Sequence, residues 1–360
     1  MKQYDEKIRT GIFLRKLEIK SLVLYVLNEY CMSFSIIIPL YNRPEEVDEL
    51  LSSLCEQTFM EFEVIIVEDG STLKSDAVVD KYRDRLDITY FYKTNSGPGL
   101  SRNAGAERAK NDYLIFFDSD CVIPPHYMET VSRSLQENFT DAYGGPDAAL
   151  PSFTTVQKAI NYSMTSFFTT GGIRGKSRSM DRFYPRSFNM GVSRPAFKAL
   201  GGYGSMRFGE DIDFSLRLLD AGFRTTLITE AYVYHKRRST YRQFFKQVHN
   251  SGIARINLYL EHPGSLKAVH ALPALFVIVM TIILFLSALY PFLLAIPLLY
   301  SLAIFTDSLR LYKSFKIACY SIVAAWIQTT GYGSGFLSAV WRRLILKQAG
   351  FSAFEKKFYN

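Results

Sequence analysis

Short apolar runs, rich in β-branched and aromatic residues, alternate with segments of helical spacing through the first third of the chain. The runs are "FSIIIPL" (34–40), "FEVIIVED" (62–69), "ITYFY" (88–92) and "YLIFFD" (113–118). Strands that are apolar on both faces and alternate with helices predict a mainly parallel sheet, covered by helices on both sides. The predicted fold class is therefore α/β, with ligands expected outside the carboxyl ends of the strands.

A different pattern, apolar and without alternation, fills residues 271–306, which contain no charged residue. One helix of these 36 residues would be about 54 Å long, whereas a hydrocarbon core is about 30 Å thick. The simpler prediction is two transmembrane helices, about 271–289 and 291–306, with a turn at Pro291. The alternative is a buried helical core. A third uncharged stretch, 317–341, is interrupted by "GYGSG" and is predicted to span, to re-enter or to pack as a small-residue helix.

Basic residues flank this region but are absent from the predicted turn, so the large preceding domain is expected to face the cytoplasm. The prediction is a multi-pass protein of the cytoplasmic (inner) membrane, in contact with membrane lipid. The first segment is either an extension or lies before a true start at Met32. The predicted units are an extension (1–32), a catalytic domain (33–265), a membrane region (266–345) and a tail (346–360).

The formal net charge of +8 suits nucleic acid, an anionic membrane or an anionic substrate, and selects none of them. The position of the positive charge is more informative, because basic residues are concentrated in 236–246, shortly before the most apolar part of the chain. This segment is predicted to be a membrane-facing patch or a solvated helix face, and no nucleic-acid partner is expected. The four cysteines are scattered, which indicates neither a zinc site nor a disulfide framework.

Polar clusters follow the predicted strands. Asp69 ends one strand, and Gly70 lets the backbone turn beside it, so the carboxylate can accept hydrogen bonds from a ligand or simply cap a turn. The loop "NSGPGLSRNAG" (95–105) is rich in glycine and runs into a predicted helix, capped by Ser101 or a neighbour. Arg102, in the expected first turn, can grip phosphate oxygens.

The sequence "DSD" then follows a strongly apolar strand. Alternation along an extended chain points Asp118 and Asp120 the same way, with Ser119 pointing away. Two converging carboxylates suit a divalent cation, Mg²⁺ or Mn²⁺, that carries a diphosphate. A lone pair of this kind is common at solvated turns, but here the apolar strand fixes both acids at a sheet edge.

Two further candidates lie downstream. "GED" (209–211) precedes an amphipathic segment, so Asp211 is expected at a helix N-terminus, as a catalytic base or as a partner of the helix dipole. His235 ends the apolar run "AYVYH" and is either a metal ligand or a structural histidine.

Taken in order, "SIIIPLYNR", "VIIVEDGS", "GPGLSRNAG", "FFDSD" and the segment 188–223 resemble family 2 glycosyltransferases, over about residues 34–240. The resemblance implies the GT-A fold and an inverting, membrane-associated hexosyltransferase-type enzyme. It implies nucleoside contacts from Pro39 and Tyr41, base recognition by Asp69 and donor contact by Arg102.

The resemblance also places Asp118 near the ribose and the cation, and both Asp120 and His235 on the cation. Asp211 then takes the proton from the acceptor hydroxyl. The expected donor is a nucleotide sugar, most simply a UDP-sugar, and the expected acceptor is a glycan or a lipid-linked glycan. The segment 153–186 is predicted to form a mobile loop on the acceptor side.

One departure narrows the activity. "QVHNS" (247–251) lacks the QxxRW signature of processive members, which favours transfer of a single sugar in cell-surface glycan or polysaccharide synthesis. Two alternatives stay open. A polyprenyl-phosphate glycosyltransferase has an ionised acceptor and needs no base, and a non-catalytic nucleotide-sugar-binding membrane subunit keeps the pocket without turnover.

Overall fold

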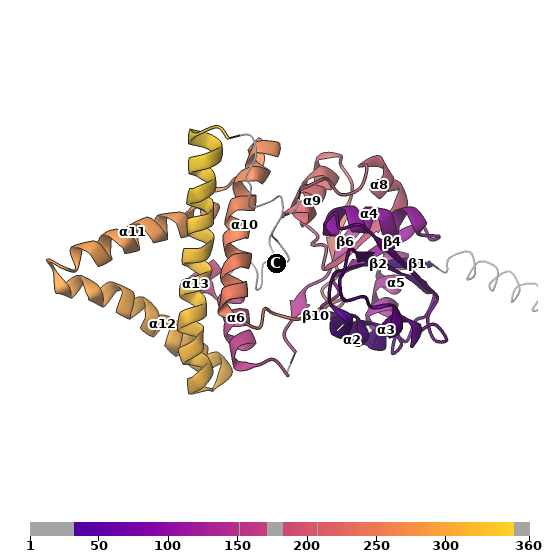
Figure 1. Ribbon diagram of the computed structural model, residues 1–360, viewed down its shortest axis with the longest axis horizontal. Helices are drawn as coiled ribbons and strands as arrows, with labels where there is room; N and C mark the ends of the chain where they lie inside the picture. The colour runs from indigo at the N-terminus through magenta and orange to yellow at the C-terminus, as the bar shows by residue number, and fades with distance from the viewer. Residues whose placement is uncertain (1–31, 151, 171–182, 207, 349–360) are drawn as a thin grey trace, which may run out of the picture.

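The computed structural model describes residues 32–150, 152–170, 183–206 and 208–348. It consists of a sheet domain with helices on both faces and a separate layer of long helices (Figure 1). The predicted extension (1–32), apart from Met32, and most of the predicted tail (346–360) lie outside the described residues.

The four predicted strands are confirmed, with ends that differ by at most one residue. They are β1 (Phe34–Leu40), β2 (Phe62–Asp69), β3 (Ile88–Lys93) and β4 (Tyr113–Phe117), and neighbours among them pair in parallel. The order of the large sheet is β3-β2-β1-β4-β8-β6-β9, where the added strands are β8 (Asn189–Ser193), β6 (Ala142–Gly144) and β9 (Thr225–Leu227). Because only β8 runs antiparallel to its neighbours, the prediction of a mainly parallel sheet is confirmed.

The alternation of side chains along β1 divides the interior into two cores. Ile36 and Ile38 point into one core, while Ile37 points into the other. The first core is covered by α2 (Pro44–Leu54), α3 (Asp76–Asp80) and α5 (Tyr127–Glu137). The second is covered by α4 (Pro98–Arg108), α8 (Arg194–Ala199) and α9 (Glu210–Asp220). Burial on both faces explains why these strands are apolar throughout.

A small second sheet carries part of the site. Its order is β5-β10-β7, formed by β5 (Cys121–Val122), β10 (Val233–His235) and β7 (Asp147–Ala148). β5 begins a few residues after β4 ends, and the antiparallel register sets His235 directly opposite Cys121. This pairing joins two segments that are more than a hundred residues apart in the sequence.

The second layer contains only helices. They are α6 (Thr155–Thr165), α7 (Phe167–Thr170), α10 (Tyr241–Glu261), α11 (Leu272–Leu286), α12 (Ala295–Tyr312) and α13 (Phe315–Ala339), with short turns η1 (Pro263–Ser265), η2 (Ala268–Ala271), η3 (Pro291–Leu294) and η4 (Val340–Ile345). The prediction of a loop over 153–186 is wrong for 155–170, because Ala159 and Ile160 bury an apolar helix face against this layer. Residues 171–182 of that predicted loop lie outside the described residues.

α13 runs unbroken through "GYGSG", and of the three outcomes predicted for 317–341 the structure shows the small-residue helix. The glycines serve close packing. A Cβ on Gly335 would lie 2.0 Å from the carbonyl oxygen of His249, and one on Gly252 would lie 2.2 Å from that of Tyr332. Helix α13 therefore packs backbone to backbone against α10, as a small-residue helix.

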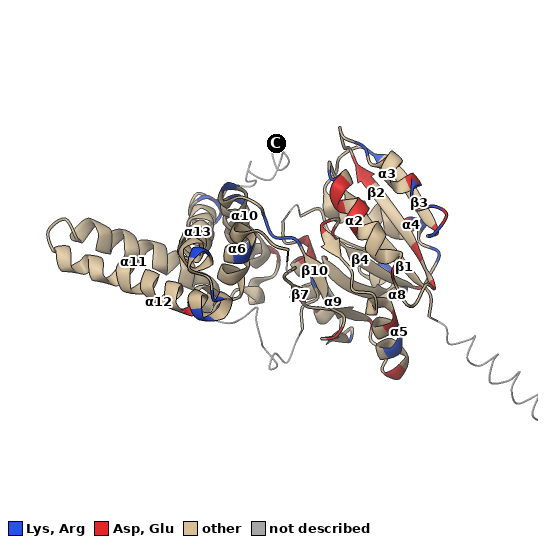
Figure 2. Ribbon diagram, turned by 90° about the horizontal axis from the view of Figure 1, so that it is seen from below, with Lys and Arg blue, Asp and Glu red and all other residues tan. Residues whose placement is uncertain are grey.

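Two helical segments, Ala268–Leu286 and Pro291–Tyr312, are long and apolar enough to cross a membrane. Helices α11 and α12 within them project together away from the rest of the molecule, and α13 lies across their base (Figures 1 and 2). The second segment continues past the predicted end at residue 306 and includes Asp307, which accepts a hydrogen bond from the Tyr162 hydroxyl at 2.7 Å.

The basic segment 236–246 does not form one surface: residues 236–238 pair with acids, whereas Arg242 and Lys246 are exposed on α10, as the solvated helix face predicts. Lys236 pairs with Glu49 at 2.7 Å, and the buried Arg237 pairs with Asp147 at 2.6 Å. Arg238 turns toward the end of β4. These side chains are directed into the fold because β10 delivers them beside the acids of the sheet edge.

Candidate active site

The predicted site residues gather at the carboxyl edge of the large sheet. Pro39 lies near the end of β1, Asp69 ends β2, and Asp118 follows β4. Tyr41 follows β1 by one residue, next to Asn42, whose positive φ of 52° turns the chain into α2. Parallel strands end on the same side of a sheet, so this clustering follows from the topology.

Asp69 fixes the glycine-rich loop. Its carboxylate accepts hydrogen bonds from the backbone N–H groups of Ser96 and Gly97, both at 2.9 Å, and pairs with Lys93 at 2.5 Å. Gly70 has φ of +77°, and a Cβ there would lie 2.6 Å from the nitrogen of Asn95. The loop therefore sits close against the end of β2. Recognition of a base by Asp69 stays a prediction.

The helix after this loop begins earlier than predicted. α4 starts at Pro98 with Gly97 at the cap position, and no side chain caps it. Ser101 donates from its hydroxyl to the Gly97 carbonyl instead, which corrects the predicted cap. Arg102 consequently lies in the second turn, where its side chain is 2% exposed.

Arg102 joins the two acidic motifs. Its guanidinium donates to Asp118 at 2.6 Å and to Glu210 at 3.0 Å, and it lies 5.4 Å from the ring centre of Tyr203. Burial lowers the pKa of Arg102, but the neighbouring carboxylates, Asp118 foremost, raise it above its ordinary value. A permanently charged group thus holds "DSD" and "GED" together across more than ninety residues of sequence.

The backbone of "DSD" turns, which corrects the prediction of an extended chain with converging carboxylates. The N–H of Cys121 donates to the carbonyl of Asp118 at 3.1 Å. The Asp118 carboxylate, 33% exposed, meets Arg102, while the Asp120 carboxylate, 9% exposed, meets other cations. A turn lets two acids of like charge each take a separate partner.

Asp120 is surrounded by positive groups. Its Oδ2 lies 2.6 Å from Arg43 and 4.0 Å from Arg238, and its Oδ1 lies 3.1 Å from Nε2 of His235. Burial raises the pKa of Asp120, but His235 and the two arginines outweigh burial and hold that pKa well below its usual value. Burial lowers the pKa of His235, and the Asp120 charge reverses this and raises it.

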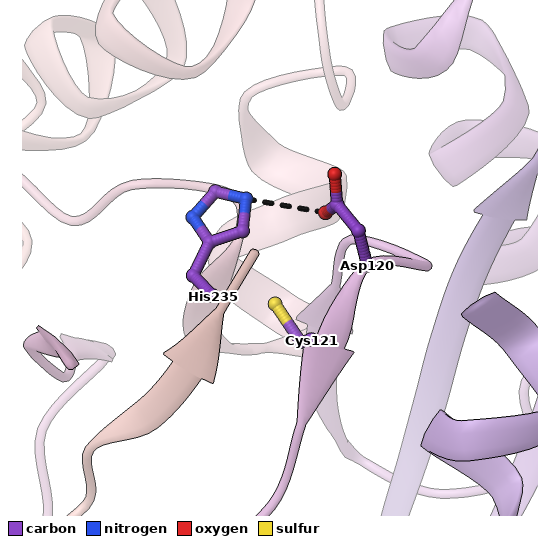
Figure 3. A group of neighbouring side chains, drawn as sticks. All are labelled: Asp120, Cys121 and His235. Carbon is purple, nitrogen blue, oxygen red and sulfur yellow. Dashed lines mark ion pairs between the residues drawn. The ribbon is translucent and has the colours of Figure 1, made fainter. Parts of the chain in front are cut away.

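Asp120, Cys121 and His235 form a group that could hold a metal ion (Figure 3), since their ligand atoms lie within 4.8 Å of one another. Carboxylate and imidazole suit Mn²⁺, and the thiol extends the set toward softer cations. The Nδ1 atom of His235 is buried without a hydrogen-bond partner among the described residues, and the ring stacks on Phe188 at 5.0 Å. Asp120 and His235 fit a divalent cation, and Cys121 lies beside them as a thiol whose pKa is raised by burial. The role of Asp118 on the cation stays a prediction.

The predicted base has a cationic partner. Asp211 Oδ2 accepts from Nε of Arg186 at 2.5 Å, and Oδ1 accepts from the N–H of Ile212 at 2.9 Å. Burial raises the pKa of Asp211, but Arg186 outweighs it and keeps that pKa below its usual value. Beside it, burial and the charge of Asp211 raise the pKa of Glu210 to about 7. Asp211 is thus ionised at neutral pH, whereas Glu210 gains or loses its proton near pH 7.

Four site residues were missed by sequence reasoning: Arg43, Cys121, Arg186 and Arg238. Arg43 and Cys121 carried weak signals, because Arg43 ends the motif "SIIIPLYNR" and Cys121 directly follows "DSD". Arg238 was singled out only as part of the basic segment 236–246, and Arg186 carried no signal, since their positions in the site depend on contacts across the fold rather than on spacing.

Comparison with known proteins identifies the family. The family described as Glycosyl transferase family 2 matches residues 35–201. A Haemophilus influenzae protein described as an uncharacterised glycosyltransferase is 32% identical over 216 residues, which cover 57% of this chain and 70% of that protein. The chain therefore belongs to glycosyltransferase family 2 and is a glycosyltransferase, as the resemblance predicted.

Two further relatives are more distant or match in part. Poly(ribitol-phosphate) beta-N-acetylglucosaminyltransferase TarS of Staphylococcus aureus is 38% identical over 114 residues, which are 31% of this chain and only 20% of TarS. The solved mannosyltransferase PcManGT of Pyrobaculum calidifontis, in complex with GDP-Man and Mn²⁺, matches 86% of this chain and 87% of its own, with a TM-score of 0.53 and 14% identity. The second likeness supports a GT-A-like α/β fold.

Proposed function

We propose that the protein is a metal-dependent, inverting glycosyltransferase of the cytoplasmic membrane face. It moves a single sugar from a nucleotide donor, most simply a UDP-sugar, to an acceptor hydroxyl in cell-surface glycan or polysaccharide synthesis. The match to TarS, whose name describes transfer of N-acetylglucosamine to a polymer, supports a glycan acceptor.

The observation that carries this proposal is the bridge made by Arg102. A single buried guanidinium contacts Asp118 after β4 and Glu210 at the start of α9. Asp211 is the next residue along α9, and we propose that it faces the acceptor side of the site. A donor held by Asp69, Arg102 and Asp118 would then present its sugar between the two motifs.

The site residues divide into a proton acceptor and a cation site. Asp211 is ionised at neutral pH and can accept the proton of an attacking hydroxyl, while α9 and Arg186 hold its orientation. The pairing with Arg186 weakens Asp211 as a base, so proton transfer requires that Arg186 shift toward the acceptor. Asp120, Cys121 and His235 would hold a divalent cation, which supplies positive charge to the departing diphosphate.

Membrane attachment belongs to the same proposal. We propose that residues 33–265 carry the reaction and that 266–345 attach the enzyme, with α11 and α12 inserted and α13 lying along the surface. The crosswise arrangement of α13 and the apolar surfaces of α11 and α12 support this. With the bases near the ends of this region on the cytoplasmic side, the site faces the cytoplasm.

The test is substitution of the proposed base. Asp211→Asn should lower transfer by about 10²- to 10⁴-fold and leave nucleotide binding within roughly twofold, measured by product formation and calorimetry on detergent-solubilised protein. Asp220→Asn, at the exposed far end of the same helix, is the matched control and should retain activity. Unchanged turnover in Asp211→Asn would reject the proposed role.

Metal dependence is tested separately. Treatment with EDTA should abolish transfer, and added Mn²⁺ should restore it; full activity in EDTA contradicts the cation site.

A second candidate, a polyprenyl-phosphate glycosyltransferase, is favoured by the contact of Arg186 with Asp211. An arginine at the acceptor side suits an acceptor phosphate, which is already ionised and needs no base. Transfer to a polyprenyl phosphate by Asp211→Asn, with loss on substitution of Arg186, would favour this candidate over the first.

A further inference from the structure

Asp120 carries more positive partners than one carboxylate requires. Two guanidinium groups and an imidazole surround a side chain that is 9% exposed. Arg43 and Arg238, in contrast, are 30% and 32% exposed, so both reach the surface of the site. Asp120 is buried, whereas the side chains of Arg43 and Arg238 are partly exposed and can move away from it.

A divalent cation and Arg43 would share one carboxylate, with Arg43 on Oδ2 and the metal-ligand group's His235 beside Oδ1. The metal-ligand group includes the Asp120 carboxylate, and Arg43 already lies 2.6 Å from one of its oxygens. A second positive charge at this distance is strongly repelled by the guanidinium in a partly buried setting. Cation binding at Asp120 is therefore favoured when Arg43 moves aside.

The backbone around Arg43 is fixed, so only its side chain needs to move. Asn42 donates from its backbone N–H to the Ser71 hydroxyl at 2.8 Å, and its side-chain oxygen accepts from the N–H groups of Thr72 and Leu73, both at 2.9 Å. These bonds tie the start of α2 to the loop after β2. A guanidinium released from Asp120 stays at the sheet edge, partly exposed and available to another anion.

We propose that Arg43, assisted by Arg238, exchanges partners during donor binding. In the free enzyme both arginines neutralise Asp120; when a divalent cation takes that carboxylate, they turn to the diphosphate of the donor. Arg43 is then a donor-binding residue whose release couples cation binding to nucleotide binding. This inference rests on the proposed function, because it requires a nucleoside-diphosphate donor.

The exchange predicts effects of opposite sign in one variant. Arg43→Ala should bind Mn²⁺ alone roughly tenfold more tightly than the wild type, because no guanidinium has to be displaced. With Mn²⁺ saturating, the same variant should bind UDP or GDP roughly tenfold more weakly, while the corresponding monophosphates change by less than about threefold. Calorimetry and the electron paramagnetic resonance of free Mn²⁺ measure these affinities on the full solubilised chain.

Arg83→Ala is the matched control, since Arg83 pairs with Asp80 on the surface of α3 and its following turn. It should leave every affinity unchanged. Arg43→Lys retains the charge and should restore most of the competition with Mn²⁺ but less of the diphosphate affinity. Thermal unfolding of all variants identifies any that lose the fold.

Two results would overturn the exchange: Mn²⁺ affinity in Arg43→Ala that is unchanged or weaker, or diphosphate affinity that is unchanged. Either result leaves the glycosyltransferase proposal intact as long as Asp211→Asn still abolishes transfer. Conversely, opposite-sign binding effects together with an Asp211→Asn enzyme of normal activity would retain the exchange and reject the proposed base.

Discussion

The carboxyl edge of the sheet and the contact between α10 and α13 are packed by opposite means. At the sheet edge, buried acids and bases meet in pairs, with Arg102, Asp120 and Asp211 each held by charged partners. Between α10 and α13, glycines at 252 and 335 remove side chains, so that one backbone touches the other. The sheet edge is specified by complementary charges, and the helix contact is specified by glycines that have no side chain.

The difference reflects the surroundings of each region. A buried charge without a partner is costly, so a site that must bind anions and cations is held in one arrangement by its own ion pairs. Under the proposed membrane attachment, α10 and α13 lie beside apolar surroundings, where helices gain little from burying more apolar surface and close van der Waals contact decides their packing. Substitutions in the two regions should therefore destabilise the protein for different reasons.

The largest effect is expected for Arg102→Ala. This change leaves Asp118 and Glu210 without their common partner, and breaking a buried ion pair in this way costs about 3–5 kcal/mol. Chemical unfolding of the solubilised protein measures the loss, and donor binding should fall with it. Arg108→Ala, at the exposed end of the same helix, should cost less than about 1 kcal/mol. Equal losses of unfolding free energy in the two variants would show that the buried ion pairs of Arg102 do not stabilise the sheet edge.

A smaller effect, dependent on pH, is expected for Glu210→Gln. The folded chain holds the proton of Glu210 up to about pH 7, whereas the ordinary pKa is 4.5. Because the folded state binds this proton more tightly than the unfolded state, the wild type loses stability as pH rises from 4.5 to about 7. Glutamine does not titrate and can still accept from Arg102.

The stability of Glu210→Gln relative to the wild type should therefore increase across that window, by at most about 3 kcal/mol. Unfolding curves at several pH values between 4.5 and 8 test this. Glu137→Gln, at the exposed end of α5, controls for loss of a surface carboxylate. A difference that stays constant with pH would show that Glu210 is ionised throughout.

The same contrast explains how much could be predicted from the sequence. The strands and the position of Asp69 and Asp118 at one edge follow from short-range apolar patterns and from parallel topology. The partners of the site residues do not, because Arg186 reaches Asp211 across 25 residues and Arg43 reaches Asp120 across 77. Such contacts depend on how β8, β10 and α9 return to the sheet, and no local pattern specifies that return.

The predictions fail or stay open where the contacting residue comes from a distant segment of the chain. "DSD" was treated as extended because the strand before it is extended, yet separate cations favour a turn. For "GYGSG" the sequence leaves three arrangements open, and a glycine inside a helix costs about 1 kcal/mol. In α13 the contact with α10 outweighs that cost, since only glycine permits the backbone approach.

The smallest effect tests that last point. Gly335→Ala should raise the intrinsic helix preference by about 1 kcal/mol, yet the added methyl would lie 2.0 Å from the His249 carbonyl oxygen. The helices must separate, so a net loss of about 1–2 kcal/mol is expected from overpacking. Gly264→Ala, where a Cβ would meet nothing within 4 Å, is the matched control and should be close to neutral. Thermal unfolding in detergent compares the two, with nucleotide affinity unchanged in both because the sheet edge is untouched. If Gly335→Ala is as stable as the control, α13 is held by its apolar side chains rather than by the glycine contact.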